Sequence, residues 1–273
     1  MSARFEHSKD KCTRVAFLEE GGGYRMRLMG ARRAATRHGG APCEGGIVNT
    51  GGGMAGGDHL SIEIEAGERA DIILSTPAAE RIYRSSGPDT LIHVALQLKA
   101  RSRLAWMPQE TILFRGARLT RHFDVNMDAS ATLIISEATV FGRLAMGETP
   151  GLGLFSDRWR IRRDDRLLHA EDTRLDGDIG RLLARPALGN GARAIATVLM
   201  ASPEAEDRLD AVRRTLVESS RCEGGASAWN GMLIGRFIAK NPVDLRVALV
   251  RFLLVMLEGK LPRLWTFGDG ASR

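Results

Sequence analysis

A stretch dense in glycine places the strongest constraint on how this chain can fold. Seven of the fourteen residues in 45–58 are glycine. Glycine adopts positive φ at no steric cost and lets another backbone come close, so the stretch is a loop with unusual dihedral angles. Residues 59–64 then alternate polar and apolar, which predicts a half-buried strand. The loop therefore delivers Asp58 and His59 to the start of a strand.

A phosphate-binding loop is the obvious functional alternative to a plain surface loop here. The stretch contains no Gly-x-x-x-x-Gly-Lys-Ser/Thr motif. A strand follows the glycines, whereas phosphate-binding and dinucleotide-binding loops lead into the N-terminus of a helix. The spacing therefore disfavours nucleotide binding at this loop.

The charge balance indicates which kinds of partner suit the chain. The 273 residues carry a formal net charge of +6, and the arginines are scattered through strand-like segments instead of lying along one helix. Aromatic residues make up only 5% of the chain, too few for a platform on which bases stack. We therefore expect an acidic protein partner and no nucleic acid.

The cysteines and the N-terminus point to a reducing compartment. Cys12, Cys43 and Cys222 are odd in number and far apart, so they predict neither a disulfide framework nor a Cys-x-x-Cys metal site. The first eleven residues lack the apolar core of a signal peptide. No apolar stretch is long enough to span a bilayer. We expect a cytoplasmic protein with no membrane contact.

Short alternating segments through residue 202 predict a β-rich fold. The segments 12–19 and 24–29 flank three glycines and are typical of a hairpin. Two later segments, 62–75 and 123–136, share one pattern at a constant offset, so that Ile62 corresponds to Phe123 and Ser75 to Ser136. This repeat favours stacked β-hairpin layers over alternating βαβ units.

Helical patterns appear only near the C-terminus. A helix is expected to start at Pro203 and to continue to about Ser219, with apolar residues at helical spacing. Pro242 opens a second helix, 243–258, which Gly259 closes. This second helix is apolar on nearly every side, which is typical of a helix that is buried or docked.

The candidate chemical groups are acids and histidines beside apolar strand residues. No catalytic motif of a common enzyme class is present in its required context. A carboxylate on a strand is usually exposed to solvent or paired with arginine. Glu137 fits that description least well, because apolar residues precede and follow it. The candidates are Asp58 with His59, Glu80, Glu110, Glu137, and Glu171 with His169 and Asp172.

Six separated motifs carry a resemblance to a known family. Residues 49–58 read Asn-Thr-Gly-Gly-Gly-Met-Ala-Gly-Gly-Asp, which is similar to the Asn-Thr-Ala-Gly-Gly-Leu-Ala-Gly-Gly-Asp signature of the UreD (UreH) urease accessory proteins. Gly51 replaces the usual Ala and Met54 the usual Leu. Five further matches follow in order: 78–85 (Ala-Ala-Glu-Arg-Ile-Tyr-Arg-Ser), 108–114 (Pro-Gln-Glu-Thr-Ile-Leu-Phe), 142–148 (Gly-Arg-Leu-Ala-Met-Gly-Glu), 157–163 (Asp-Arg-Trp-Arg-Ile-Arg-Arg) and 261–265 (Leu-Pro-Arg-Leu-Trp).

The resemblance implies a fold and a domain organisation. It implies a mainly β scaffold of stacked β-hairpins, or β-helix-like, with two C-terminal α-helices. The chain would be a single UreD-like domain over 1–273, β-rich from about 12 to 202 and helical from about 203 to 265.

The resemblance also implies a nickel-delivery chaperone, not an enzyme. Such a protein binds the apo-urease subunits and the accessory protein UreF, which recruits the GTPase UreG. No cofactor would be tightly bound, but Ni²⁺ would pass transiently along an internal polar route. On this interpretation Asp58, Glu137 and Glu171 line the route, because oxygen ligands hold Ni²⁺ loosely and release it.

Two alternatives stay open at this point. One is a pure protein scaffold that reshapes urease without touching metal. The other is a cytoplasmic β-solenoid enzyme acting on carbohydrate, with Asp58 and a glutamate as its acid pair.

Overall fold

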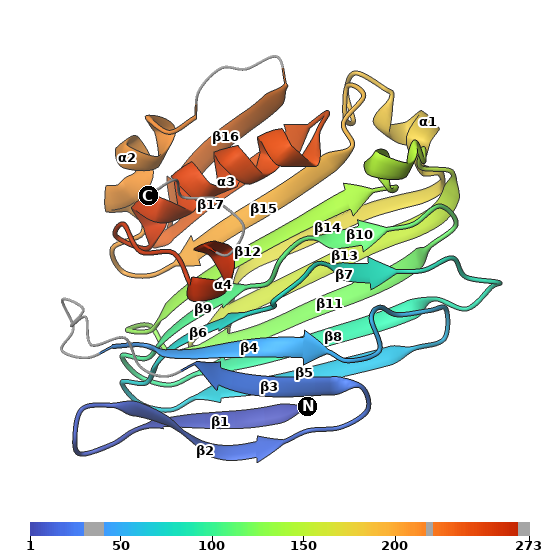
Figure 1. Cartoon of the computed structure of the whole chain (residues 1–273). Coiled ribbons are helices and arrows are strands. Elements are labelled where there is room, and N and C mark those ends of the chain that lie inside the picture. The colour runs from blue at the N-terminus through green and yellow to red at the C-terminus, as the bar shows by residue number, and fades with distance from the viewer. Residues whose placement is uncertain (30–40, 217–220, 267–273) are drawn as a thin grey trace, which may run out of the picture.

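The computed structural model describes residues 1–29, 41–216 and 221–266, which form a mainly β protein of two sheets (Figure 1). Sheet A has the order β14 (Arg166–Asp178), β13 (Leu152–Arg163), β11 (Arg118–Met127), β8 (Thr90–Leu98), β5 (His59–Ala66), β1 (Ser2–His7) and β2 (Thr13–Glu19). Sheet B has the order β16 (Cys222–Trp229), β17 (Met232–Ala239), β15 (Ala194–Ala201), β12 (Thr132–Phe141), β9 (Arg103–Met107), β6 (Asp71–Ser75), β4 (Cys43–Asn49) and β3 (Tyr24–Met29). The short strands β7 (Glu80–Ile82) and β10 (Thr111–Leu113) extend sheet B from β12.

The centre of the molecule is a solenoid-like stack of coils. The chain runs through β5 in sheet A to β6 in sheet B, returns to β8, and repeats this path through β9, β11, β12 and β13. Each strand pairs in parallel with its equivalent in the next coil. The mainly β, β-helix-like fold predicted from the sequence is therefore confirmed.

The offset between the two similar segments corresponds to two coils. Ile62 pairs with Val94 in the next coil, and Val94 pairs in turn with Phe123 in the coil after that. The two segments that share the pattern are thus the first and third coils. Each segment contributes one strand to sheet A and one strand to sheet B. The segments are therefore not hairpins, since β5 and β6 do not pair with each other. The middle coil, which contains β8 and β9, does not show the shared sequence pattern.

The N-terminal strands do not form the hairpin predicted for residues 12–29. β2 pairs with β1 in sheet A, whereas β3 pairs with β4 in sheet B. The glycines at 21–23 therefore carry the chain from one sheet to the other. The prediction was wrong because the two strands belong to different sheets, each with its own antiparallel partner, β1 or β4.

The C-terminal part mixes strands with helices. Within the described residues, the helix expected from Pro203 is reduced to two short pieces, η2 (Glu206–Arg208) and α2 (Leu209–Arg213), and residues 217–220 lie outside the description. β16 and β17 follow before the second expected helix. The remaining helical elements are η1 (Leu144–Met146), α1 (Ile179–Leu183), α3 (Pro242–Met256) and α4 (Arg263–Thr266).

Helix α3 matches its sequence signals. Asn241 caps its N-terminus by accepting a hydrogen bond from the Val243 N–H at 2.9 Å, and Pro242 occupies the first turn. Gly259 adopts a φ of 83° just beyond the helix, as a left-handed C-terminal residue does. The helix packs on β15 and β17 (Figure 1). Its outer side leaves Val243 and Val247 exposed.

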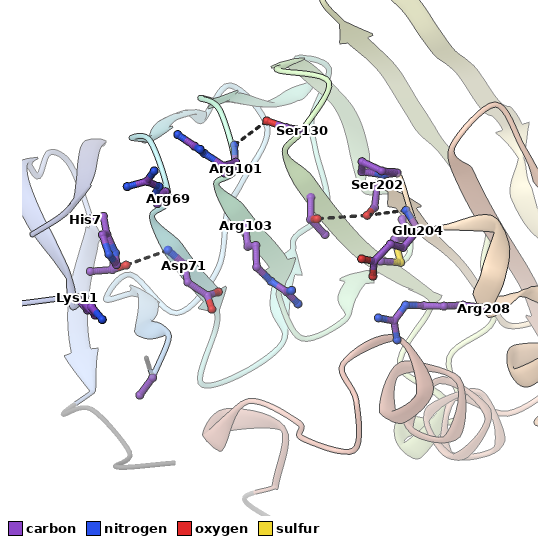
Figure 2. Close-up of a pocket in the computed structure, with 15 residues that line it drawn as sticks. His7, Lys11, Arg69, Asp71, Arg101, Arg103, Ser130, Ser202, Glu204 and Arg208 are labelled. Atoms are coloured by element: carbon purple, nitrogen blue, oxygen red, sulfur yellow. Dashed lines mark hydrogen bonds between the residues drawn. The ribbon is translucent and has the colours of Figure 1, made fainter. Parts of the chain in front are cut away.

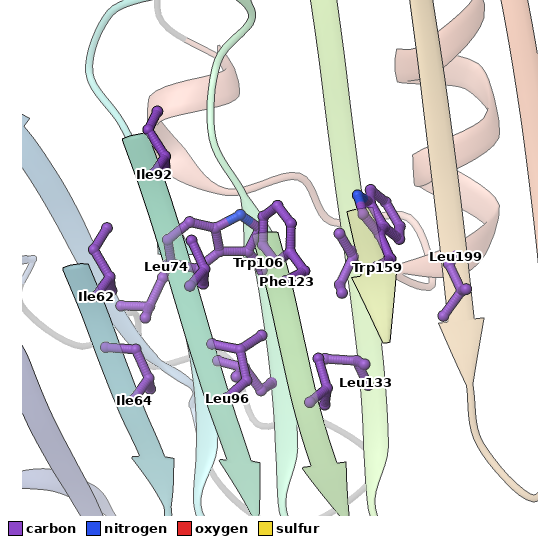
Figure 3. Packing of buried hydrophobic residues seen from close by; sticks show 14 of the residues in the cluster. Ile62, Ile64, Leu74, Ile92, Leu96, Trp106, Phe123, Leu133, Trp159 and Leu199 are labelled. Carbon is purple, nitrogen blue, oxygen red and sulfur yellow. The ribbon is translucent and has the colours of Figure 1, made fainter. Parts of the chain in front are cut away.

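The centre of sheet B, at β12, β15 and β17, is buried on both faces because two apolar cores enclose it. The inner core fills the space between the sheets, where Phe123 packs against Trp106 and Trp159 (Figure 3). The outer core lies between sheet B and α3 and holds Phe252 and its neighbours. Sheets with both faces covered have continuous apolar runs in their strands, as β12 does.

The contact between α3 and sheet B sets a test of this packing. A Cβ on Gly235 of β17 would lie 2.6 Å from Phe252 Cζ, inside the fully buried outer core. We expect Gly235→Ala to lower the free energy of unfolding by about 1–3 kcal/mol through overpacking. Gly225→Ala in β16 is the control, since a Cβ there meets nothing within 4 Å. Urea unfolding curves for both variants check this, and equal midpoints would contradict the packing.

Candidate functional site

Four of the six signature motifs pack together where the coils cross from sheet B back to sheet A. β7 in motif 78–85 pairs in parallel with β10 in motif 108–114. Met54 of the glycine loop bridges to Ile82, and the Gly142 N–H donates to the Leu113 carbonyl at 2.7 Å. Arg143 lies over the Phe114 ring, 4.4 Å from its centroid. We call this region, residues 49–58, 78–85, 108–114 and 142–148, the motif edge.

The glycine loop depends on close approach at two of its positions. A Cβ on Gly53 would lie 2.5 Å from the Tyr83 ring, and one on Gly56 would lie 2.2 Å from Ser85 Oγ. Gly57 adopts a φ of 93°, and a Cβ there would meet only an ordinary contact with Pro88. Tyr83 holds the loop by donating its hydroxyl hydrogen to the Gly52 carbonyl at 2.9 Å. The glycines thus let the loop lie directly on motif 78–85.

A half-buried polar group joins the loop to the same motif. The Asn49 side-chain amide donates to Glu80 Oε1 at 2.8 Å, and the Tyr24 hydroxyl donates to Glu80 Oε2 at 2.9 Å. Burial raises the pKa of Glu80 and that of Tyr24, whose phenol also faces this carboxylate. Asn49 and Glu80 are separated in the sequence by about the length of one coil. The repeat length could therefore have predicted that these two side chains lie next to each other.

Asp58 lies at the exposed end of the glycine loop. Its Oδ2 accepts a hydrogen bond from the Ala55 N–H at 2.7 Å, and its own N–H donates to the Ala55 carbonyl. Its carboxylate therefore closes the last turn before β5, as an Asp at a turn commonly does. The structure does not bring Asp58 together with Glu137 or Glu171.

Glu137 lies in the inner core, where it shares a buried arginine with a second acid. Arg121 of β11 donates to both Asp157 oxygens, at 3.0 and 2.6 Å, and also to Glu137 Oε2. Trp106 Nε1 donates to Glu137 Oε1 at 2.7 Å. Arg121 and Glu137 are 3% and 5% exposed, which makes this a fully desolvated group. We call these four residues the Arg121 cluster.

The charges of the Arg121 cluster are unequal, with one cation facing two acids. Burial raises the pKa of Glu137, and the negative Asp157 adds to this, although Arg121 pulls it down. Burial opposes the charge of Arg121, but the two carboxylates outweigh that effect and raise its pKa. Burial in this cluster therefore favours the protonated form of Glu137.

Glu171 of β14 belongs to a half-buried cluster at the edge of the inner core. Arg236 donates to its Oε2 at 2.8 Å, and His169 Nε2 lies 3.2 Å from the same oxygen. Burial works against the charge of Glu171, but these two partners lower its pKa overall. The Thr197 hydroxyl, 3.5 Å from Glu171 Oε1, sits directly opposite Glu137 in the pairing of β12 with β15. Glu137 and Glu171 thus flank one threonine.

Arg121 and Asp157 were not predicted from the sequence as site residues. The coil register contains the signal, because Arg121 pairs with Ile92, which pairs with Leu60. An arginine therefore occupies an inward position that is apolar in the two preceding coils.

Within the described ranges, no group of three or more His, Cys, Asp or Glu side chains is arranged to hold a metal ion. No described helix is long and apolar enough to cross a membrane.

The coils, the motif edge and the Arg121 cluster define a solenoid-like β scaffold with a polar group in its core. Residues 2–266 match the family model described as UreD urease accessory protein, so the chain belongs to that family. It is 46% identical to the urease accessory protein UreD of Xanthobacter autotrophicus over 93% of this chain and 84% of that protein. The UreD of Methylobacterium sp. (strain 4-46) is also 46% identical, over 93% and 89%. The UreD of Rhodopseudomonas palustris (strain HaA2) is 42% identical, over 97% and 92%.

The glycine loop gives a first prediction for this site. We expect both Gly56→Val and Gly57→Val to lower the melting temperature, but for different reasons. At Gly56 the new side chain would collide with Ser85 and the Pro88 carbonyl, whereas at Gly57 it would strain a left-handed backbone by about 1–3 kcal/mol. Gly87→Val is the control, because its Cβ meets nothing within 4 Å. Thermal unfolding followed by circular dichroism measures all three.

The raised pKa of Glu137 gives a prediction about pH. The folded chain holds a proton on Glu137 at pH values where the unfolded chain, with a pKa near 4.5, has lost it. Stability from this group is therefore present at low pH and declines as pH rises above about 4.5. Glu137→Gln cannot titrate, so its stability relative to the parent should rise between pH 4.5 and 8. Urea midpoints at both pH values test this, and a constant difference would contradict it.

Proposed function

We propose that this protein acts in urease maturation as a non-catalytic scaffold that binds the apo-urease subunits and UreF, and reaches UreG through UreF. The observation that carries the proposal is the match to the UreD family over residues 2–266. The packing of four signature motifs into one motif edge supports it, because it gathers them at one end of the strands, where a partner could contact them together.

The internal acids supply a second part of the proposal, which concerns nickel as cargo. Asp58, Glu137 and Glu171 would act as weak oxygen ligands that pass Ni²⁺ onward and do not store it. The position of Glu137 and Glu171 on either side of Thr197 supports a short polar route between the inner core and its edge. Asp58 would serve a separate step at the exposed loop.

A scaffold without metal contact is the second candidate, and the ion pairs favour it. Both Glu137 oxygens already accept hydrogen bonds, from Trp106 and from Arg121. Arg236 and His169 likewise engage Glu171. Removing one member of a buried ion pair strands its partner and costs roughly 3–5 kcal/mol. If these acids only hold the fold, their loss reduces complex formation before it reduces nickel loading.

The carbohydrate-active alternative has less support. Its acid pair would need two carboxylates facing each other across a substrate. Asp58 instead uses its carboxylate to close a turn by accepting a hydrogen bond from the Ala55 N–H. The relatives are named accessory proteins, which favours a role without turnover.

Co-purification tests the scaffold role. Tagged urease subunits are expressed with UreF and UreG, with and without this chain. We expect UreF and UreG to co-purify with apo-urease only when the chain is present, and urease activity to depend on it. Equal recovery and equal activity without the chain would contradict the proposed function.

Conservative changes at the three acids separate the conduit from the scaffold. Asp58→Asn, Glu137→Gln and Glu171→Gln are compared with Asp176→Asn, an exposed acid outside both clusters. A conduit predicts an intact complex with less nickel per urease active site. A scaffold predicts that nickel per recovered complex stays at the level of the control. Pull-down yield and nickel content, measured on the same samples, decide between them.

A further inference from the structure

A cavity of about 370 Å³ lies at the opposite crossing of the coils, where the chain passes from sheet A to sheet B. It sits beside the turns that follow β5, β8 and β11, so it lies at the far ends of the strands from the motif edge. Figure 2 shows side chains from several of these turns around one space. We call it the cationic groove, defined by Lys11, Arg69, Arg101, Arg103 and Arg208.

The coil repeat builds the cationic groove as a row. Arg69 and Arg101 occupy equivalent places in successive coils, and both adopt the left-handed region, with φ values of 59° and 57°. Arg103 begins β9 and pairs with Asp71 on one side and Thr132 on the other. The row therefore crosses β6, β9 and β12 and ends beyond β15 at Arg208.

Positive charge in the groove exceeds what its acids neutralise. Five lysine and arginine side chains line it, against Asp71 and Glu204 as the acids. Neither the Lys11 nor the Arg103 side chain has a hydrogen-bond or ion-pair partner within the described ranges. Arg69 and Arg101 share a single acid, Glu68, outside the lining. An anion entering the groove would thus find unpaired donors.

Two orphaned nitrogens also line the groove. His7 Nδ1 and Arg208 Nε are buried and have no hydrogen-bond partner in the part of the chain that the structure describes. Arg208 keeps its other nitrogens on the Val255 carbonyl and on Glu258. Its side chain and that of Arg103 extend into the same space from two sides (Figure 2). The two nitrogens add to the polar character of the groove walls.

We propose that the cationic groove binds an extended acidic segment of a protein partner. Neighbouring strands lie about 4.8 Å apart, so the row from β6 to β15 spans roughly 14 Å. An extended peptide covers that length with four or five residues, at about 3.3 Å each. A single phosphate would engage only one part of the row. The proposal rests on the proposed function only in placing that partner within the urease assembly.

The binding test uses a fluorescein-labelled peptide of ten glutamates and the full chain. We expect saturable binding, measured by fluorescence anisotropy, that weakens at least tenfold in Lys11→Glu/Arg103→Glu. Arg166→Glu/Arg181→Glu is the matched control, since it makes the same change in net charge at exposed arginines outside the groove. Circular dichroism confirms that both double variants fold.

Two results would overturn the assignment. One is equal weakening in both double variants, which would mean that net charge alone attracts the peptide. The other is stoichiometric binding of pyrophosphate as tight as that of the peptide, which would make the groove a small-anion site.

A second measurement separates this inference from the proposed function. The groove variant replaces the parent chain in the co-purification, and we expect at least one urease component to be lost from the complex. Full recovery of every component, despite lost peptide binding, would overturn the placement of the acidic partner in the urease assembly. The proposed function would stand in that case, because it depends on removal of the whole chain.

Discussion

The parallel register between successive coils decides which side chains meet inside this protein. Leu60, Ile92, Arg121 and Asp157 occupy one inward row across β5, β8, β11 and β13. The first two are apolar, so the row begins as ordinary core. Arg121 cannot leave that row without shifting its whole strand, because a slip by one residue would turn every inward side chain outward. The core around it must therefore provide its partners.

Those partners come from both sheets, which ties the two layers together at one point. Asp157 lies next to Arg121 in sheet A, whereas Glu137 and Trp106 reach across from sheet B. A buried ion pair gives little net stability compared with an apolar core, since desolvation offsets the attraction. Its effect here is on specificity: only one alignment of the sheets pairs every charge.

The sequence predicts local features of this fold better than long-range ones. Alternation along β5, and the Pro242 and Gly259 signals around α3, depend on neighbouring residues and were confirmed. The middle coil was missed because β9, Leu-Ala-Trp-Met, lacks the β-branched run of β6 and β12.

The hairpin predicted over 12–29 was wrong because β2 and β3 join different sheets, where β2 pairs with β1 and β3 pairs with β4. Within the described residues, the long helix predicted from Pro203 is reduced to η2 and α2. The candidate site likewise contains one residue that local sequence predicts and one that it does not. Glu137 was recognised by its apolar neighbours, but Arg121, its partner in space, needed the coil register.

The separation between the motif edge and the cationic groove has a further consequence. Both lie at strand ends, so the length of the strands sets the gap, about 33 Å for the ten residues of β11. A protein held at one end leaves room for another at the opposite end. That gap is hard to change. Because inward and outward side chains alternate along each strand, every strand would have to gain or lose two residues, and all coils would have to change together. The number of coils can change without altering this gap. A scaffold of this kind therefore keeps a fixed distance between its two ends, even when its width changes.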